Sequence, residues 1–208
     1  MKTTETAKTI TIVLLAAIVL ALTVTFKNNI LLYSAFISFV IIIGANVLTK
    51  KAVGYFFETD VKIRFWSLYQ YGFRKDMHFK KPVPMLWLSL LLALFSKGFL
   101  WWLAILEFDV AAKTERVSRR HGLYRFTQVT EWHMAWIAVW GIAINLILAI
   151  AGYFIGFEMF AKLSIYYAAW SILPISNLDG AKIFFSSKSM WAIIFTILVI
   201  FVGWGLII

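Results

Sequence analysis

The chain has 208 residues, of which 62% are hydrophobic and only 14% charged, and its mean hydropathy is +0.84. A soluble domain carries about 25% charged residues, so this composition predicts an integral membrane protein and excludes an ordinary soluble enzyme. The chain has no cysteine, which excludes disulfides and thiolate metal sites. The formal charge of +10 predicts basic cytoplasmic loops that face anionic lipid, so we expect membrane lipids and no nucleic acid as partners.

The amino-terminal quarter predicts two membrane-spanning helices. Residues 9–26 form an apolar stretch that is long enough to cross a bilayer. No small-residue cleavage site followed by a soluble domain comes after it, so we expect a retained span and not a signal peptide. A second apolar run covers residues 30–48 and ends in a small and polar cluster, Gly44–Lys51. The two spans are expected to form an antiparallel hairpin.

Residues 52–84 are polar, basic and rich in aromatic side chains, which is typical of a cytoplasmic loop at the headgroups. Within them, Asp60–Phe65 alternates polar and apolar residues. A period of two predicts a strand with one wet face, and so a short membrane-associated β segment.

The apolar stretch at residues 84–106 is interrupted by Ser96-Lys97-Gly98. It is either one span with a buried lysine or a re-entrant hairpin that turns at Lys97-Gly98. The flanking segments 52–81 and 107–130 are both basic, and positive charge accumulates on the cytoplasmic side, which favours the hairpin.

Three further spans are expected at residues 132–157, 159–176 and 189–208. The first of them carries Gly141 and Asn145 at i and i+4, on one helix face, where a small residue and an amide favour helix packing. The expected fold is therefore an all-α polytopic membrane protein with one domain over residues 1–208. It has about five to six transmembrane helices, with the amino terminus and the basic loops cytoplasmic.

The stretch Ser171–Ile183 has the sequence S-I-L-P-I-S-N-L-D-G-A-K-I. Pro174 interrupts a helix and Asp179-Gly180 is a turn signal, so a span is expected to unwind here. An ionisable group at the end of a span is a functional-site hypothesis, which singles out Asp179. The alternative is a polar turn in which Asp179 caps the next helix. Pairing of Asp179 with Lys182 and exposure of Asp179 to a groove both remain open.

The order of these features resembles the site-2 proteases, the intramembrane zinc metalloproteases. In that family a helix with H-E-x-x-H supplies two ligands and a general base, and a membrane-embedded β-hairpin follows it. A later helix carries a G-x-x-x-N-type motif, and an N-P-x-P-x-D-G-like motif supplies an aspartate ligand. The matching stretches here are Gly141-x-x-x-Asn145 and Leu173–Gly180.

The resemblance also implies that this chain lacks the catalytic residues of the family. It aligns H-E-x-x-H with Ala45-Asn46-Val47-Leu48-Thr49, followed by Lys50, so both histidines and the glutamate are missing. Catalytic zinc needs three protein ligands and an open water position, and Asp179 is the one retained ligand. We therefore expect no catalytic residue and no metal or cofactor.

The three histidines do not rebuild a zinc site in an obvious way. His78 and His121 lie in basic loops, where neighbouring cations disfavour a metal. His133 and Glu131 are two residues apart and do not share a helix face, although a Glu131/His133/Asp179 site is an alternative. The simpler interpretation places Glu131 at a helix amino terminus, where negative charge is favoured.

Three functions remain open. The first is a proteolytically inactive relative that binds or escorts transmembrane helices of client proteins, alone or as a subunit of a membrane complex. Its groove is expected to contain Asn46, Gly141, Asn145, Asn177 and Asp179. The second is an active protease with a displaced zinc site. The third is a small transporter or channel subunit in which Lys97, Asn145 and Asp179 line a polar path.

Overall fold

The computed structural model describes residues 2–26, 32–70, 78–113 and 129–208. Four of its helices are long and apolar enough to cross a membrane. They are α1 (Lys2–Thr25), α2 (Leu32–Phe56), α5 (Glu131–Phe154) and α8 (Lys188–Ile207). The expectation of five to six such helices was too high for this part of the chain.

Three helices are shorter: α3 (Leu86–Phe95) and α6 (Glu158–Ser171), which lie in the expected spans 84–106 and 159–176, and α7 (Asp179–Ser186). At 1.5 Å per residue, the 14-residue α6 is about 21 Å long, shorter than a hydrocarbon core of about 30 Å. The chain then bends through residues 172–178, where Pro174 removes a backbone donor and Ser176 has a φ of +50°. Helix α7, which was not expected, follows this break.

The stretch at residues 84–106 is a hairpin and not one straight helix. Helix α3 ends at Phe95, and Lys97 and Gly98 turn the chain with φ angles of +52° and +77°. The segment that follows has no regular secondary structure and returns along α3, where the Ser89 hydroxyl donates to the carbonyl of Trp102. Thr23 and Ser89 hydroxyls lie 3.1 Å apart, which ties the hairpin to α1.

Two antiparallel two-stranded sheets connect the helices. Strand β1 (Thr59–Phe65) confirms the strand that the alternation at Asp60–Phe65 predicts. Its partner is β4 (Leu106–Ala112), a strand that we did not predict in the basic segment 107–130. Strands β2 (Ser67–Gln70) and β3 (His78–Pro84) form the second sheet.

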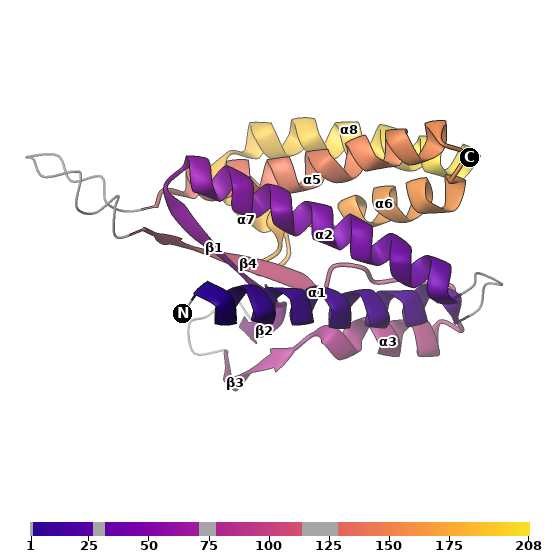
Figure 1. The fold of residues 1–208 in the computed structure, drawn as a ribbon, viewed down its shortest axis with the longest axis horizontal. Coiled ribbons are helices and arrows are strands. Elements are labelled where there is room, and N and C mark those ends of the chain that lie inside the picture. The colour runs from indigo at the N-terminus through magenta and orange to yellow at the C-terminus, as the bar shows by residue number, and fades with distance from the viewer. Residues whose placement is uncertain (1, 27–31, 71–77, 114–128) are drawn as a thin grey trace, which may run out of the picture.

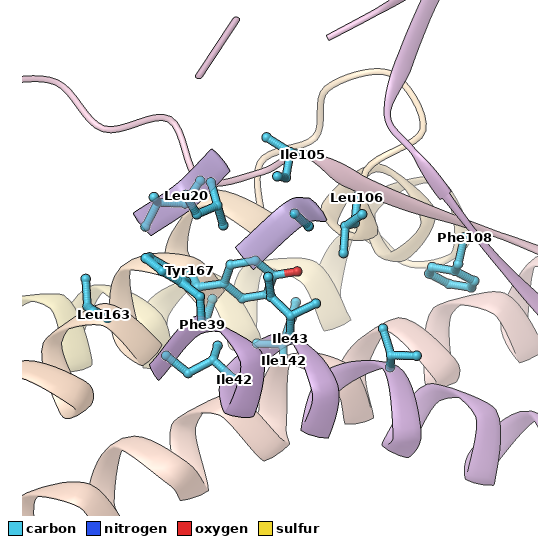
Figure 2. Packing of buried hydrophobic residues seen from close by; sticks show 14 of the residues in the cluster. Leu20, Phe39, Ile42, Ile43, Ile105, Leu106, Phe108, Ile142, Leu163 and Tyr167 are labelled. Atoms are coloured by element: carbon cyan, nitrogen blue, oxygen red, sulfur yellow. The ribbon is translucent and has the colours of Figure 1, made fainter. Parts of the chain in front are cut away.

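Figure 1 shows α1 and α3 side by side, with α2 above them and α5, α6 and α8 on the far side of α2. Buried aliphatic and aromatic side chains from α1, α2, α5, α6 and α8 form the main core, and Trp66, Ala104 and Leu178 form a second, smaller cluster. Figure 2 shows α2 residues such as Phe39 and Ile43 beside Tyr167 of α6, with Ile105 and Leu106 across from them. The irregular segment before β4 is thus part of the core.

Candidate functional site

A buried ion pair joins α2 to the first residue of α7. The Lys50 Nζ lies 2.6 Å from the Asp179 Oδ2, and their side chains are 6% and 4% exposed. Helix α2 continues to Phe56, beyond the end predicted at residue 48, and this continuation carries Lys50 into the interior. A buried charge is tolerated when it is paired, so each residue depends on the other.

Asp179 does not cap α7. The residue at the N-cap is Leu178, which makes no side-chain cap, and Asp179 follows it as the first helical residue. A carboxylate in the first turn is still favoured by the partial positive charge of the helix amino terminus. The sequence left the partner of Asp179 open, and the structure shows that it is Lys50. Lys182 donates to the carbonyl of Phe108.

One helix turn before Lys50, α2 contacts α5 at Gly141. The Asn46 amide Nδ2 donates to the Gly141 carbonyl at 2.7 Å, and Asn46 is 1% exposed. A Cβ at Gly141 would lie 2.5 Å from Cε of Lys50 and 3.2 Å from Nδ2 of Asn46. The absence of a side chain at Gly141 therefore lets both polar groups of α2 approach α5.

Gly180 has the same role between α6 and α7. A Cβ there would lie 1.8 Å from the carbonyl oxygen of Ile172, a backbone atom at the end of α6. The same carbonyl accepts a hydrogen bond from Nε1 of Trp191 at 2.9 Å. The Asp179-Gly180 pair thus supplies the charge and the close backbone contact that hold α7 in place.

Strand β4 brings Phe108 between two ammonium groups. Lys182 Nζ lies 3.7 Å from the centre of the Phe108 ring, and Lys50 Nζ lies 4.9 Å from it. Both distances are within the range of cation–π attraction. Burial lowers the pKa of Lys182 to about 8, although the Asp179 carboxylate opposes this shift. Burial also raises the pKa of the neighbouring Glu107 carboxyl.

Several atoms of this buried region have no hydrogen-bond partner among the residues that the structure describes. They include Oδ1 of Asp179 and both amide atoms of Asn145, a residue that is fully buried. The main-chain carbonyl of Asn145 accepts from the Ser164 hydroxyl at 2.7 Å. Asn46, Asn145 and Asp179 are therefore packed inside the protein and are not on an open surface.

Asn177 is the exception among the predicted groove residues. It is exposed and lines a cavity of about 350 Å³ beside α7. Polar residues on the cavity wall include Asp109, Glu131, Ser176 and Lys182. The predicted site thus divides into a buried part around Asp179 and an accessible part around Asn177.

The donor set around Asp179 does not fit catalytic zinc. The Asp179 Oδ2 is bound by the Lys50 ammonium, and the side chain of Ala45 has no ligand atom. The Asn46 amide nitrogen donates to the Gly141 carbonyl. No group of three or more His, Asp or Glu side chains converges in the part of the chain that the structure describes. His133 lies against the Phe57 ring and next to the Thr130 hydroxyl, in the first turn of α5.

The expectations for His78 and His121 are not tested by the structure. The side chain of His78 and all of His121 lie outside the described residues. Lys97, expected by the transporter alternative to line a polar path, is exposed at the turn after α3.

The sequence interpretation missed the roles of Lys50, Phe108 and Lys182. Lys50 was noted as a basic residue after the degenerate motif, and its i+4 spacing from Asn46 places both on one helix face. The alternation L-E-F-D-V at residues 106–110 is a strand signal that locates Phe108. No signal in the sequence pairs Lys50 with a residue 129 positions away.

Comparison of the chain with protein-family models, with curated proteins and with solved structures finds no match. The resemblance to the site-2 proteases therefore stays a prediction from the sequence.

Proposed function

We propose that this chain is an integral membrane relative of the site-2 proteases that binds transmembrane helices of client proteins without cleaving them. The observation that carries the proposal is the buried Lys50–Asp179 ion pair. It joins the helix with the degenerate H-E-x-x-H position to the helix that begins with the D-G motif.

The contacts among the three motif segments support the family relationship. Asn46 bonds to Gly141, and Lys50, one turn further along α2, bonds to Asp179. Segments that are 95 and 129 residues apart in the chain thus meet in one place. A site assembled from these segments is what the resemblance implies.

The same contacts argue against hydrolysis. A metal ion at Asp179 has to displace an ammonium that already neutralises the carboxylate in a buried environment. An amide at residue 46 has no basic oxygen to accept a proton from water, so the general-base position is lost as well. For the active-protease alternative, two ligands and a base have to come from elsewhere in the chain.

A groove between α2 and α5 is the surface that best fits a client helix. Its volume is about 440 Å³, and its wall is apolar except for a few hydroxyl groups. Ser34 and Ser38 of α2 and Gly152 of α5 line it. Small residues four apart on one helix allow a second transmembrane helix to approach closely, and Ser34-x-x-x-Ser38 has this spacing.

A photo-crosslinking amino acid at Ser38 tests the proposal in native membranes, with the same group at Ile193 as the control. Ile193 is 62% exposed on α8, outside the groove. We expect residue 38, and not residue 193, to capture membrane proteins with a transmembrane helix, each at its full-length mass. Identical partners at both positions, or cleaved partners at residue 38, would overturn the proposal.

A further inference from the structure

A polar cavity of about 290 Å³ lies where the start of α1, the end of α2 and strand β1 meet. Four basic and two acidic residues line it, which gives the cavity a net charge of +2. They are Lys8, Lys51, Lys62, Arg64, Glu5 and Asp60. Glu5 and Lys62 form an ion pair at 3.4 Å, and Arg64 pairs with Asp109 at 2.9 Å. With these two pairs neutralised, the charges of Lys8 and Lys51 exceed that of Asp60 by one, so the cavity stays positive.

An apolar groove of about 390 Å³ continues from this cavity along α1 and α2. Thr9 and Lys51 line both, so they mark the junction between the polar and the apolar part. Lys51 Nζ donates to the Thr9 hydroxyl at 2.9 Å, which holds the ammonium at this junction. Gly44 lines the groove and leaves free space in it, because a Cβ at this position would have no atom within 4 Å.

We propose that the cavity and the groove together bind one anionic phospholipid. The phosphate lies in the cavity near Lys8 and Lys51, and an acyl chain lies in the groove over Gly44. A net positive cavity attracts an anionic headgroup, and basic pockets between helices at the membrane surface are typical of such recognition. A client helix does not fit as well, because one end of this site is charged.

The inference rests on the membrane location in the proposed function, but not on client binding. The client groove between α2 and α5 shares no lining residue with the lipid site. Loss of lipid binding and loss of client capture at residue 38 are therefore separate results.

Native mass spectrometry of the detergent-purified protein tests the lipid site. The probes are dioleoyl phosphatidylglycerol and dioleoyl phosphatidylcholine, which share acyl chains and differ in headgroup charge. We expect the wild-type protein to bind one phosphatidylglycerol more tightly than phosphatidylcholine. Lys51→Gln should lower the affinity for phosphatidylglycerol about fivefold, since one lysine near an anionic surface contributes about 1 kcal/mol. Its affinity for phosphatidylcholine should stay the same.

Gly44→Leu separates the acyl part of the site from the headgroup part. It should weaken the binding of both lipids by a similar factor, because the leucine fills the groove and leaves the cavity unchanged. Leu14→Phe fills the same groove from α1 and replaces Gly44→Leu if that variant does not fold. Lys188→Gln is the control for lysine removal, because Lys188 is exposed at the start of α8 and lines neither part of the site.

Three results would overturn the inference. The first is equal wild-type affinity for the two lipids, and the second is an equal loss of phosphatidylglycerol binding in Lys51→Gln and Lys188→Gln. The third is binding of sn-glycerol 3-phosphate as tight as that of phosphatidylglycerol, because the ligand would then be a soluble phosphate ester and the groove would contribute nothing.

Discussion

Single residues set the contact between α2, α5 and α7. Lys50 and Asp179 contribute opposite charges that are both buried, while Gly141 and Gly180 contribute the space that brings the backbones together. Removing one member of a buried ion pair costs more than the pair contributes, because the other charge is left without compensation. A glycine is also costly to replace where the atom nearest to a new Cβ belongs to the backbone, because a backbone atom cannot rotate away as a side chain can.

Asp179→Asn tests whether the ion pair or a helix cap determines the role of this residue. A lost cap costs about 1 kcal/mol, whereas an uncompensated buried Lys50 costs about 3–5 kcal/mol. We expect the larger loss in the free energy of unfolding, measured by denaturant titration in detergent. The double variant Lys50→Met/Asp179→Leu should recover most of it, because it removes both charges. A loss of 1 kcal/mol or less in the single variant would contradict the ion-pair role.

Gly180→Ala tests the contact between the end of α6 and the start of α7. The new Cβ would lie 1.8 Å from the Ile172 carbonyl oxygen, so the backbone has to shift. We expect a loss of about 1–3 kcal/mol, the usual range for overpacking, or failure to fold. Gly203→Ala is the matched control, because a Cβ at Gly203 of α8 has no atom within 4 Å. Gly203→Ala should be neutral or stabilising, because alanine favours a helix more than glycine does. Comparable losses in the two variants would show that contact with Ile172 does not determine the result.

At the scale of elements, sequence periodicity predicted the helices and strands that short local patterns define. The strand at Asp60–Phe65 and the long apolar helices follow from patterns within a few residues of each other. Strand β4 has the same alternation as β1, but an apolar run before it and basic residues after it obscured the signal. Helix α2 was predicted to end near residue 48, because lysines at positions 50 and 51 are typical of the end of a span.

The candidate site shows the limit of this reasoning. Asp179 was singled out because a lone carboxylate at the end of an apolar run is costly. Its partner Lys50 comes from a distant helix, and only the packed structure defines that pair. The length of α6 and the start of α7 likewise depend on how residues 172–178 pack, and Pro174 alone predicts a break without its geometry.

Lys182 makes the contact between α7 and β4 sensitive to pH. Its pKa is about 8 in the folded protein and 10.5 in the unfolded chain, so the unfolded chain binds more protons between these two values. The free energy of unfolding should therefore rise as the pH increases from 8 to 10. Below pH 8 both states hold the proton, and this contribution becomes constant.

A comparison of the wild-type protein with Lys182→Met at pH 7.5 and 9.5 isolates the contribution of Lys182. We expect the wild type to gain more stability than the variant between these pH values, measured by unfolding in the same detergent. An equal gain in both proteins would mean that other groups cause the pH dependence. A wild-type gain smaller than that of the variant would reverse the sign and contradict a lowered pKa.

At the scale of the whole molecule, four helices that are long and apolar enough to cross a membrane and the hairpin after α3 define the topology that we expect in a bilayer. We expect α1 and α2 to cross in opposite directions, which places the start of α1 and the end of α2 on the same side of the membrane. The hairpin then returns the chain to the side from which it came. The sheets and the starts of α5 and α8 are therefore expected on the same side as the amino terminus, together with most of the positive charge.

Cysteine labelling tests this topology without background, because the chain has no cysteine of its own. Single cysteines at Lys8, Lys113 and Lys188 should react with a membrane-impermeant maleimide only after the cell is permeabilised. A cysteine at Glu158, the first residue of α6 after the turn from α5, should react in intact cells. These outcomes follow from the excess of lysine and arginine on the cytoplasmic side and from the hairpin at Lys97 and Gly98. If Lys113 reacted in intact cells while Lys8 did not, residues 86–105 would cross the bilayer fully. The polar cavity beside Asn177 would then not lie on the cytoplasmic side with the amino terminus.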